Sequence, residues 1–241
     1  MKGVLTTAAC ALPALALAAA GCYCIYISFG WVHILIYLLA CLLFFPVAAL
    51  LHEAGHLVFG GISGMRVKLG RPRVFAPSSC TVMPRRSGNM RRRFIVTALG
   101  GLAVNLLTAA VGMGLLFADG AALYFSFLAP ASFYLFMINV LPAEYAGGGT
   151  DMLLAMRAAK NTAEWQVLAR VLDIQGMVAE GRALADIDED YFFSVPQIAE
   201  DESAFIMLVS LRADYYKAKG DGANAAKWEG RLEELRANIP Q

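Results

Sequence analysis

Long apolar stretches without any charged residue are the dominant pattern of this chain. Residues 3–51 contain no Lys, Arg, Asp or Glu, which leaves room for two membrane-spanning helices of about 20 residues each. A break near Gly30 separates the two. Two further uncharged runs cover residues 94–118 and 120–143. The pattern therefore predicts four transmembrane helices, near residues 4–28, 31–57, 94–118 and 121–141.

The first apolar run has a second interpretation, a cleaved signal peptide. Lys2 precedes it, and residues 17–22 loosely resemble a lipoprotein cleavage box. However, Ala19 stands three positions before Cys22, where a larger aliphatic residue is usual, and the apolar run continues through Phe29. We therefore predict a retained helix.

A different pattern occupies the segment between the second and third apolar helices. Apolar and polar residues alternate over 65–69 and 80–83, which is typical of short strands. Residues 61–84 could thus form a small β-hairpin at the membrane edge, able to receive an extended peptide by strand addition. A plain loop is the alternative.

The last 91 residues have another character, because they hold 16 of the 19 acidic and 10 of the 20 basic residues. Helical periodicity runs through 152–184 and 202–237, and a break is expected at 220–222. Residues 211–235 are typical of a single tetratricopeptide-type helical hairpin, although one such unit is weak support for a repeat protein. We predict two domains, a membrane core (1–150) and a cytoplasmic helical domain (151–241) on which a protein partner could dock.

Composition supports the membrane assignment. Hydrophobic residues make up 59% of the 241 residues, and the mean hydropathy is +0.57. These values are high for a soluble globular protein, so the fold class we expect is an all-α polytopic membrane protein embedded in a lipid bilayer.

Charge gives the expected orientation of the chain in the membrane. Between Gly61 and Arg93 there are nine basic residues and no acidic one: Arg66, Lys68, Arg71, Arg73, Arg85, Arg86, Arg91, Arg92 and Arg93. The positive-inside rule places this loop in the cytoplasm, so both termini are predicted to be cytoplasmic in a multi-pass protein of a bacterial-type cell membrane. Nucleic-acid binding would also explain the basic run, but a loop that sets topology needs no partner, and we predict no nucleic-acid ligand.

Candidate chemistry lies in five residues at the end of the second apolar run, from His52 to His56 (His-Glu-Ala-Gly-His). Four residues apart on a helix, the two imidazoles lie on one face about 6 Å apart and can bind one zinc ion. Glu53 can reach water on the metal without being a ligand, and catalytic zinc lowers the pKa of bound water to about 7. Ionisable residues at membrane depth are costly and therefore point to function. The lone His33 would lie near the other membrane surface, about 28 Å away along a helix, and is expected to be a packing residue.

A third ligand must come from the same side of the membrane. Within residues 1–150 the only acidic residues are Glu53, Asp119 and Glu144, and the predicted topology places Asp119 on the outer side. Glu144 and Asp151 remain, both just beyond the fourth apolar run. Pro142 ends that helix, and the following glycines allow a turn that could direct either carboxylate back to the metal.

The chain resembles the site-2-protease family of zinc intramembrane metalloproteases. The resemblance covers roughly residues 35–155 and rests first on the His-Glu-Ala-Gly-His helix and on Asn139-Val140-Leu141-Pro142 followed by a glycine-bearing loop and Asp151. It also rests on Gly100-Gly101-Leu102-Ala103-Val104-Asn105, which is similar to the family's Gly-Pro-x-x-Asn helix with Leu102 in the proline's place. The family usually has Asp-Gly at the third ligand, whereas Asp151 is followed by Met152. Thr150-Asp151 after a longer loop looks like a subgroup in which Ser, Thr or Asn precedes the Asp.

The resemblance implies that His52, His56 and Asp151 hold one Zn²⁺ per chain. It further implies that Glu53 is the catalytic base, and that Asn139 and Asn105 bind substrate or stabilise the oxyanion. A helix–helix hydrogen bond is the alternative role for either asparagine.

Peptide-bond hydrolysis in a membrane-protein or peptide substrate is the function that these residues indicate. The enzyme would be an intramembrane zinc metalloendopeptidase, using water activated by Glu53. The alternative is a non-proteolytic zinc-binding membrane scaffold or adaptor, which would need the ligands but not Glu53.

Overall fold

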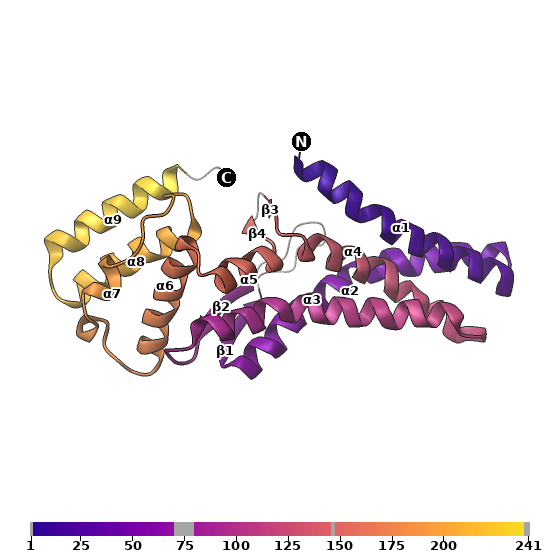
Figure 1. Cartoon of the computed structure of the whole chain (residues 1–241), viewed down its shortest axis with the longest axis horizontal. Helices are drawn as coiled ribbons and strands as arrows, with labels where there is room; N and C mark the ends of the chain where they lie inside the picture. Colours follow the sequence, from indigo (N-terminus) through magenta and orange to yellow (C-terminus); the bar gives the residue numbers. More distant parts are fainter. Residues whose placement is uncertain (1, 70–79, 146–147, 239–241) are drawn as a thin grey trace. The chain divides into compact units, whose positions relative to one another are not determined.

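The structure, a computed structural model, describes residues 2–69, 80–145 and 148–238 and is mainly helical (Figure 1). It divides into two compact units. The first, here called the membrane unit, comprises Met1–Gly61, Val67–Thr81 and Val96–Ala155. The second, called the tail unit, comprises Ile62–Arg66, Val82–Ile95 and Met156–Gln241.

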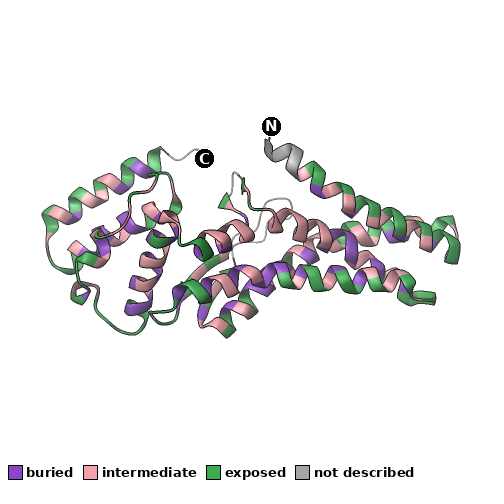
Figure 2. Ribbon diagram, in the orientation of Figure 1, coloured by how far each residue is buried: buried purple, intermediate pink, exposed green. Residues whose placement is uncertain are grey.

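Within the described residues, four helical segments are long and apolar enough to cross a membrane: Thr7–Phe29, Trp31–Ser63, Met90–Phe117 and Gly120–Val140. They belong to α1 (Lys2–Phe29), α2 (Trp31–Ser63), α3 (Met90–Gly114) with η1 (Leu115–Phe117), and η2 (Gly120–Phe127) with α4 (Leu128–Val140). Large apolar side chains such as Leu35, Leu42 and Leu107 are exposed along them, as the green stretches of Figure 2 show. A surface of this kind is suited to lipid contact. The all-α polytopic membrane fold is thereby confirmed.

Local chemistry explains where these segments begin and end. Gly30 separates α1 from α2 with φ +92°, a left-handed conformation that favours glycine, and its N–H donates to Tyr26 O (2.9 Å). The fourth segment starts as a 3-10 helix rather than the α-helix expected there. Pro130 lacks an N–H and so cannot bond the carbonyl of Ser126, which favours the tighter turn upstream.

Aromatic residues fill the end of the membrane unit where α1, α2 and η2 meet. Tyr37 is fully buried in a cluster with Ile25 and Leu123. Its hydroxyl lies 3.3 Å from Ser126 Oγ, and it packs so closely on Gly21 that a Cβ there would lie 2.0 Å from the hydroxyl oxygen.

Two small sheets lie between the helices. β1 (Met65–Leu69) pairs with β2 (Cys80–Pro84), so the predicted hairpin has its two strands, while its connection at 70–79 lies outside the described residues. The second sheet was not predicted. It pairs β3 (Glu144–Tyr145) antiparallel to β4 (Gly148–Gly149), with Glu144 opposite Gly149, and it directly precedes α5 (Asp151–Lys160).

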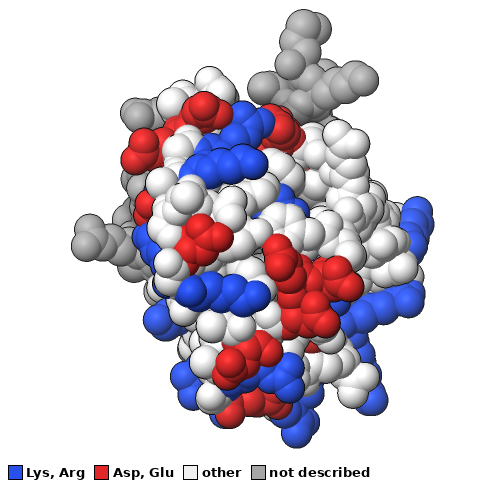
Figure 3. All heavy atoms as spheres, turned by 90° about the vertical axis from the view of Figure 1, so that its left-hand side faces the viewer, with Lys and Arg blue, Asp and Glu red and all other residues white. Residues whose placement is uncertain are grey.

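Helices also make up the C-terminal part of the tail unit. They are α6 (Ala163–Ala179), η3 (Leu184–Asp186), α7 (Asp190–Phe193), α8 (Ser203–Ala218) and α9 (Gly222–Ala237). Val167 and Val171 of α6 pack on Leu208 of α8, and the predicted break falls between α8 and α9. Acidic and basic side chains are interspersed on the face seen in Figure 3, as expected for a surface in water.

Within the tail unit, α6 packs on the segment that leads into α3. Gly88 N–H donates to Asp173 Oδ1 (2.9 Å), and Ser87 Oγ donates to Glu180 Oε2 (2.7 Å). Gly176 makes room for this segment, because a Cβ at that position would lie 2.7 Å from Ser87 N. The start of α3, which carries groups of the candidate site further along, is therefore fixed by neighbours.

Candidate metal centre

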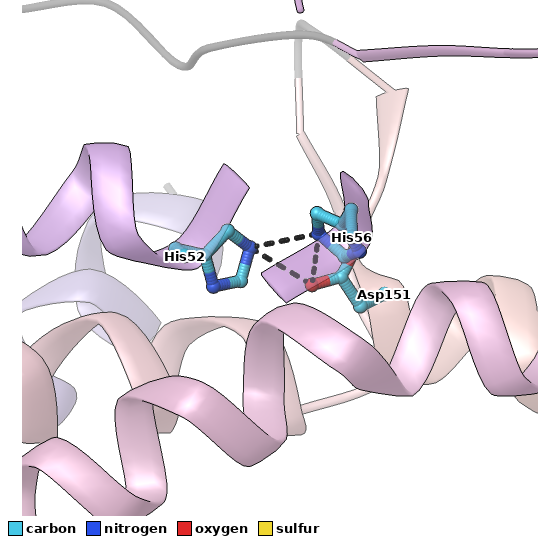
Figure 4. A group of neighbouring side chains, drawn as sticks. All are labelled: His52, His56 and Asp151. Carbon is cyan, nitrogen blue, oxygen red and sulfur yellow. Dashed lines mark hydrogen bonds and ion pairs between the residues drawn. The ribbon is translucent and has the colours of Figure 1, made fainter. Parts of the chain in front are cut away.

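Two histidines of α2 lie on one face of the helix, toward α3. His52 and His56 are 7% and 3% exposed, and their Nε2 atoms are 3.1 Å apart, with the rings nearly perpendicular (87°). The four-residue spacing produces this pairing on any regular helix. Both rings therefore present the same nitrogen to the same point (Figure 4).

Asp151 brings a carboxylate to that point from the first residue of α5. Its Oδ2 lies 3.0 Å from His52 Nε2 and 3.4 Å from His56 Nε2. The three donors could hold one metal ion, since all their ligand atoms lie within 4.8 Å of one another. Burial acts to raise the pKa of Asp151, but hydrogen bonds from the two imidazoles and their charges outweigh it, so that this pKa is lowered.

Thr150 sets the position of Asp151. Its hydroxyl donates to Leu141 O (2.7 Å), its N–H donates to Ala143 O (3.0 Å), and its carbonyl accepts from Leu154 in the first turn of α5. A Thr directly before a helix can also cap its free N–H groups, and Thr150 Oγ1 lies 3.4 Å from Leu153 N. The third donor thus stands at the start of a capped helix.

The outer nitrogens of both imidazoles, that is the Nδ1 atoms on the side away from Asp151, face α3. His56 Nδ1 lies 2.8 Å from the backbone oxygen of Thr97, and His52 Nδ1 lies 3.0 Å from the side-chain nitrogen of Asn105. Thr97 and Asn105 are eight residues apart, which is two turns of helix on one face. Because α2 and α3 run antiparallel, the earlier residue of α3, Thr97, meets the later histidine, and Asn105 meets His52, so each ring is also contacted on its Nδ1 side.

Glycines create the space in which the rings lie. A Cβ on Gly101 would be 2.6 Å from both His52 Cε1 and His56 Nε2, and a Cβ on Gly55 would be 2.5 Å from Gly100 O. Backbone groups cannot yield at such distances, so α2 and α3 approach this closely only because glycine is present.

Glu53 is 6% exposed on the same turn of α2 as His52. It interacts with Cys80 at the start of β2. Burial, the negative charges of Glu53 and Asp151, and a hydrogen bond with Glu53 raise the pKa of the Cys80 thiol to about 12. The acid expected to serve as the base is therefore buried next to the donors and has a neutral thiol beside it.

The other residues considered as site candidates are not among the three donors. Asn139 donates its amide to Leu135 O (3.0 Å) in its own helix, and its proposed substrate or oxyanion role stays a prediction. Glu144 is exposed in β3 and does not belong to the group of three donors. His33 bonds Tyr124 and stacks near Phe29, as expected for a packing residue.

Sequence reasoning did not assign the roles of three groups, of which two left some signal. Thr150 has the N-cap pattern of a Thr before a helix with an acidic first turn. Gly101 and Asn105 are spaced by four, like the histidines, but only packing shows that Gly101 faces the rings. Thr97 acts through its backbone oxygen, which no side-chain pattern reveals.

The chain matches no family model, no curated protein and no solved structure with which it was compared. Chemical inference therefore rests on the site itself. Two imidazoles and one carboxylate, converging in a buried position, are a donor set suited to a divalent transition metal.

Proposed function

We propose that this protein is an intramembrane zinc metalloprotease, similar to the site-2-protease family. The observation that carries the proposal is the triangle of donor atoms from His52, His56 and Asp151, with edges of 3.0, 3.1 and 3.4 Å. A tetrahedral zinc ion with ligands at about 2.0–2.1 Å holds its donors about 3.3 Å apart, so the triangle fits one such ion.

The surroundings of the donors support the same ion. Gly101 leaves space where a side chain would press on both rings, and Thr97 O accepts from the outer nitrogen of His56, which leaves Nε2 free to bind metal. The group has three members among the described residues. Three protein ligands leave a fourth position for water or substrate, as catalytic zinc sites do and structural ones do not.

Zinc in such a site, when bound, supplies Lewis-acid chemistry that lowers the pKa of water and polarises a carbonyl group. Glu53 then accepts a proton from the attacking water, whose oxygen bonds to the carbonyl carbon of the scissile peptide. As the C–N bond breaks, the Glu53 carboxyl gives that proton to the leaving nitrogen. Its position one residue after His52 supports this role, since Glu53 would lie near a bound metal without being a ligand.

Membrane-spanning or membrane-associated polypeptides are the substrate class that the location supports. Two of the three donors, His52 and His56, lie on α2, which among the described residues is one of four segments apolar enough to span a bilayer, and α2 exposes Leu42, Leu43 and Leu50. An extended peptide could add to an open edge of the two-stranded β1–β2 sheet. With the basic segment 61–93 on the cytoplasmic side, both termini are cytoplasmic in this proposal.

The test is Glu53→Gln, because this change keeps size and polarity while it removes the base. The variant and the wild type are purified in detergent, reconstituted in liposomes with a library of single-span reporter peptides, and the products are identified by mass spectrometry. We expect about one zinc per chain in both proteins and a fall in cleavage of about 10²–10⁴-fold in Glu53→Gln. Zinc chelation should stop the wild type, and added zinc should restore it.

Glu144→Gln is the matched control, since Glu144 is an exposed acid close to the site in sequence. It should cleave like the wild type. If Glu53→Gln cleaves at the wild-type rate, the mechanism is wrong. If the wild type holds zinc but yields no products, the chain is a zinc-binding membrane scaffold or adaptor instead.

A further inference from the structure

Asn105 is fully buried on α3 and faces the outer nitrogen of a metal-site histidine. Its Nδ2 lies 3.0 Å from His52 Nδ1, while its Oδ1 has no hydrogen-bond partner among the described residues. A buried amide oxygen without a partner is destabilising, so a residue kept in this state calls for an explanation.

The chemistry of metal binding by imidazole explains why an amide is present at this position. When Nε2 of a histidine binds a metal through its lone pair, Nδ1 carries the proton and must donate it. Thr97 O already accepts from His56 Nδ1 in this way. Among the described residues, the Asn105 amide lies in the corresponding place beside His52, and it has both a donor end and an acceptor end.

We propose that Asn105 is a positioning residue for His52: its carbonyl oxygen accepts from Nδ1–H and so keeps the Nε2 lone pair directed at the metal. A half-turn about the Cβ–Cγ bond exchanges Oδ1 and Nδ2 in nearly the same space. The proposal rests on the metal site of the proposed function. It differs from the substrate or oxyanion role expected for Asn105 from sequence, because Asn105 acts here through a ligand and touches no substrate.

Three variants distinguish these roles by zinc affinity, measured by chelator competition in detergent. Asn105→Leu keeps the branching at Cγ and has no acceptor, so zinc affinity should fall about 10- to 100-fold. Asn105→Asp has an acceptor and no donor, so affinity should stay within about threefold of the wild type or increase. Thr108→Val removes a hydroxyl that bonds Val104 O in the same helix and should leave zinc affinity unchanged.

The chain has three histidines, so ¹⁵N-histidine NMR of the zinc-loaded protein gives a second readout. We expect a protonated Nδ1 on His52 in the wild type, with its resonance shifted in Asn105→Asp. Saturating zinc should restore most of the peptide cleavage of Asn105→Leu, since a positioning residue is needed mainly to hold the ligand.

Several outcomes would overturn the assignment. Wild-type zinc affinity in Asn105→Leu, with cleavage lost even at saturating zinc, would establish a substrate or oxyanion role. An equal loss of zinc in Asn105→Asp and Asn105→Leu would mean that the donor end is required. Absence of zinc from the wild type would overturn both the positioning role of Asn105 and the proposed protease function. Failure of proteolysis alone would leave the zinc measurements, and hence the role of Asn105, intact.

Discussion

Histidines occur at two places in the membrane unit, and the packing around them differs. Around His52 and His56, α2 and α3 meet through Gly55, Gly100 and Gly101, and the two imidazoles belong to a group that could hold a metal ion. Around His33, the neighbours are rings: Phe29 and Tyr124 lie with centroids 5.5 and 6.1 Å from its own.

The difference shows that a histidine in an apolar helix does not by itself indicate a metal site. Where glycines leave space and a carboxylate enters it, imidazoles converge on a point at which an ion fits. Where aromatic side chains take up the space, the imidazole becomes one more ring with a hydrogen bond, here to Tyr124. Substitutions at the two places should accordingly change different properties.

Removal of the carboxylate should have the largest effect. Asp151→Ala leaves two imidazoles and should lower zinc affinity by more than about 100-fold, because a lost ligand costs more than a lost outer partner, which costs about 10–100-fold. Zinc per chain and the zinc-dependent rise in unfolding temperature measure it. Glu144→Ala should retain about one zinc; loss of zinc in Glu144→Ala but not in Asp151→Ala would make Glu144 the ligand.

A methyl group at Gly101 should have the next largest effect. In Gly101→Ala the new Cβ would be 2.6 Å from atoms of both rings. Overpacking costs about 1–3 kcal/mol, which corresponds to about 5- to 150-fold in zinc affinity if the rings are displaced. Gly114→Ala on the same helix meets nothing within 4 Å and is the control. Equal zinc affinity in the two variants would show that Gly101 does not shape the site.

The same change at the aromatic end should affect stability instead. In Gly21→Ala the Cβ would lie 2.0 Å from the Tyr37 hydroxyl, and Tyr37 is fully enclosed. We expect destabilisation of about 1–3 kcal/mol, seen as a lower unfolding temperature in detergent, with unchanged zinc stoichiometry. Gly61→Ala, with open space around it, serves as the reference. A loss of zinc in Gly21→Ala would mean that the two places are coupled.

His33→Gln should have the smallest effect. Glutamine can still hydrogen-bond Tyr124, so the free energy of unfolding should change by no more than about 1 kcal/mol and zinc content should stay the same. Reduced zinc in His33→Gln would contradict the packing role and call for a second metal-binding position.

The sequence predicted the helices well and the assembly of the site only in part. Hydrophobic runs specify membrane spans because the bilayer requires them, and a helix repeat of 3.6 residues makes His52, Glu53 and His56 readable as a unit. The carboxylate is harder to predict, because proximity of Asp151 to the rings depends on the bonds of Thr150 to residues 141–143. The backbone oxygen of Thr97 has no signature in sequence at all.

The closure at Thr150 also bears on how such sites are recognised in other chains. Because Thr150 bonds to Leu141 and Ala143, the two ends of the intervening segment, which contains β3 and β4, are held next to each other. Insertions or deletions between β3 and β4 need not move Asp151. A signature with a set number of residues between the proline and the aspartate would therefore overlook chains that share this geometry, whereas one anchored on the capping threonine would find them.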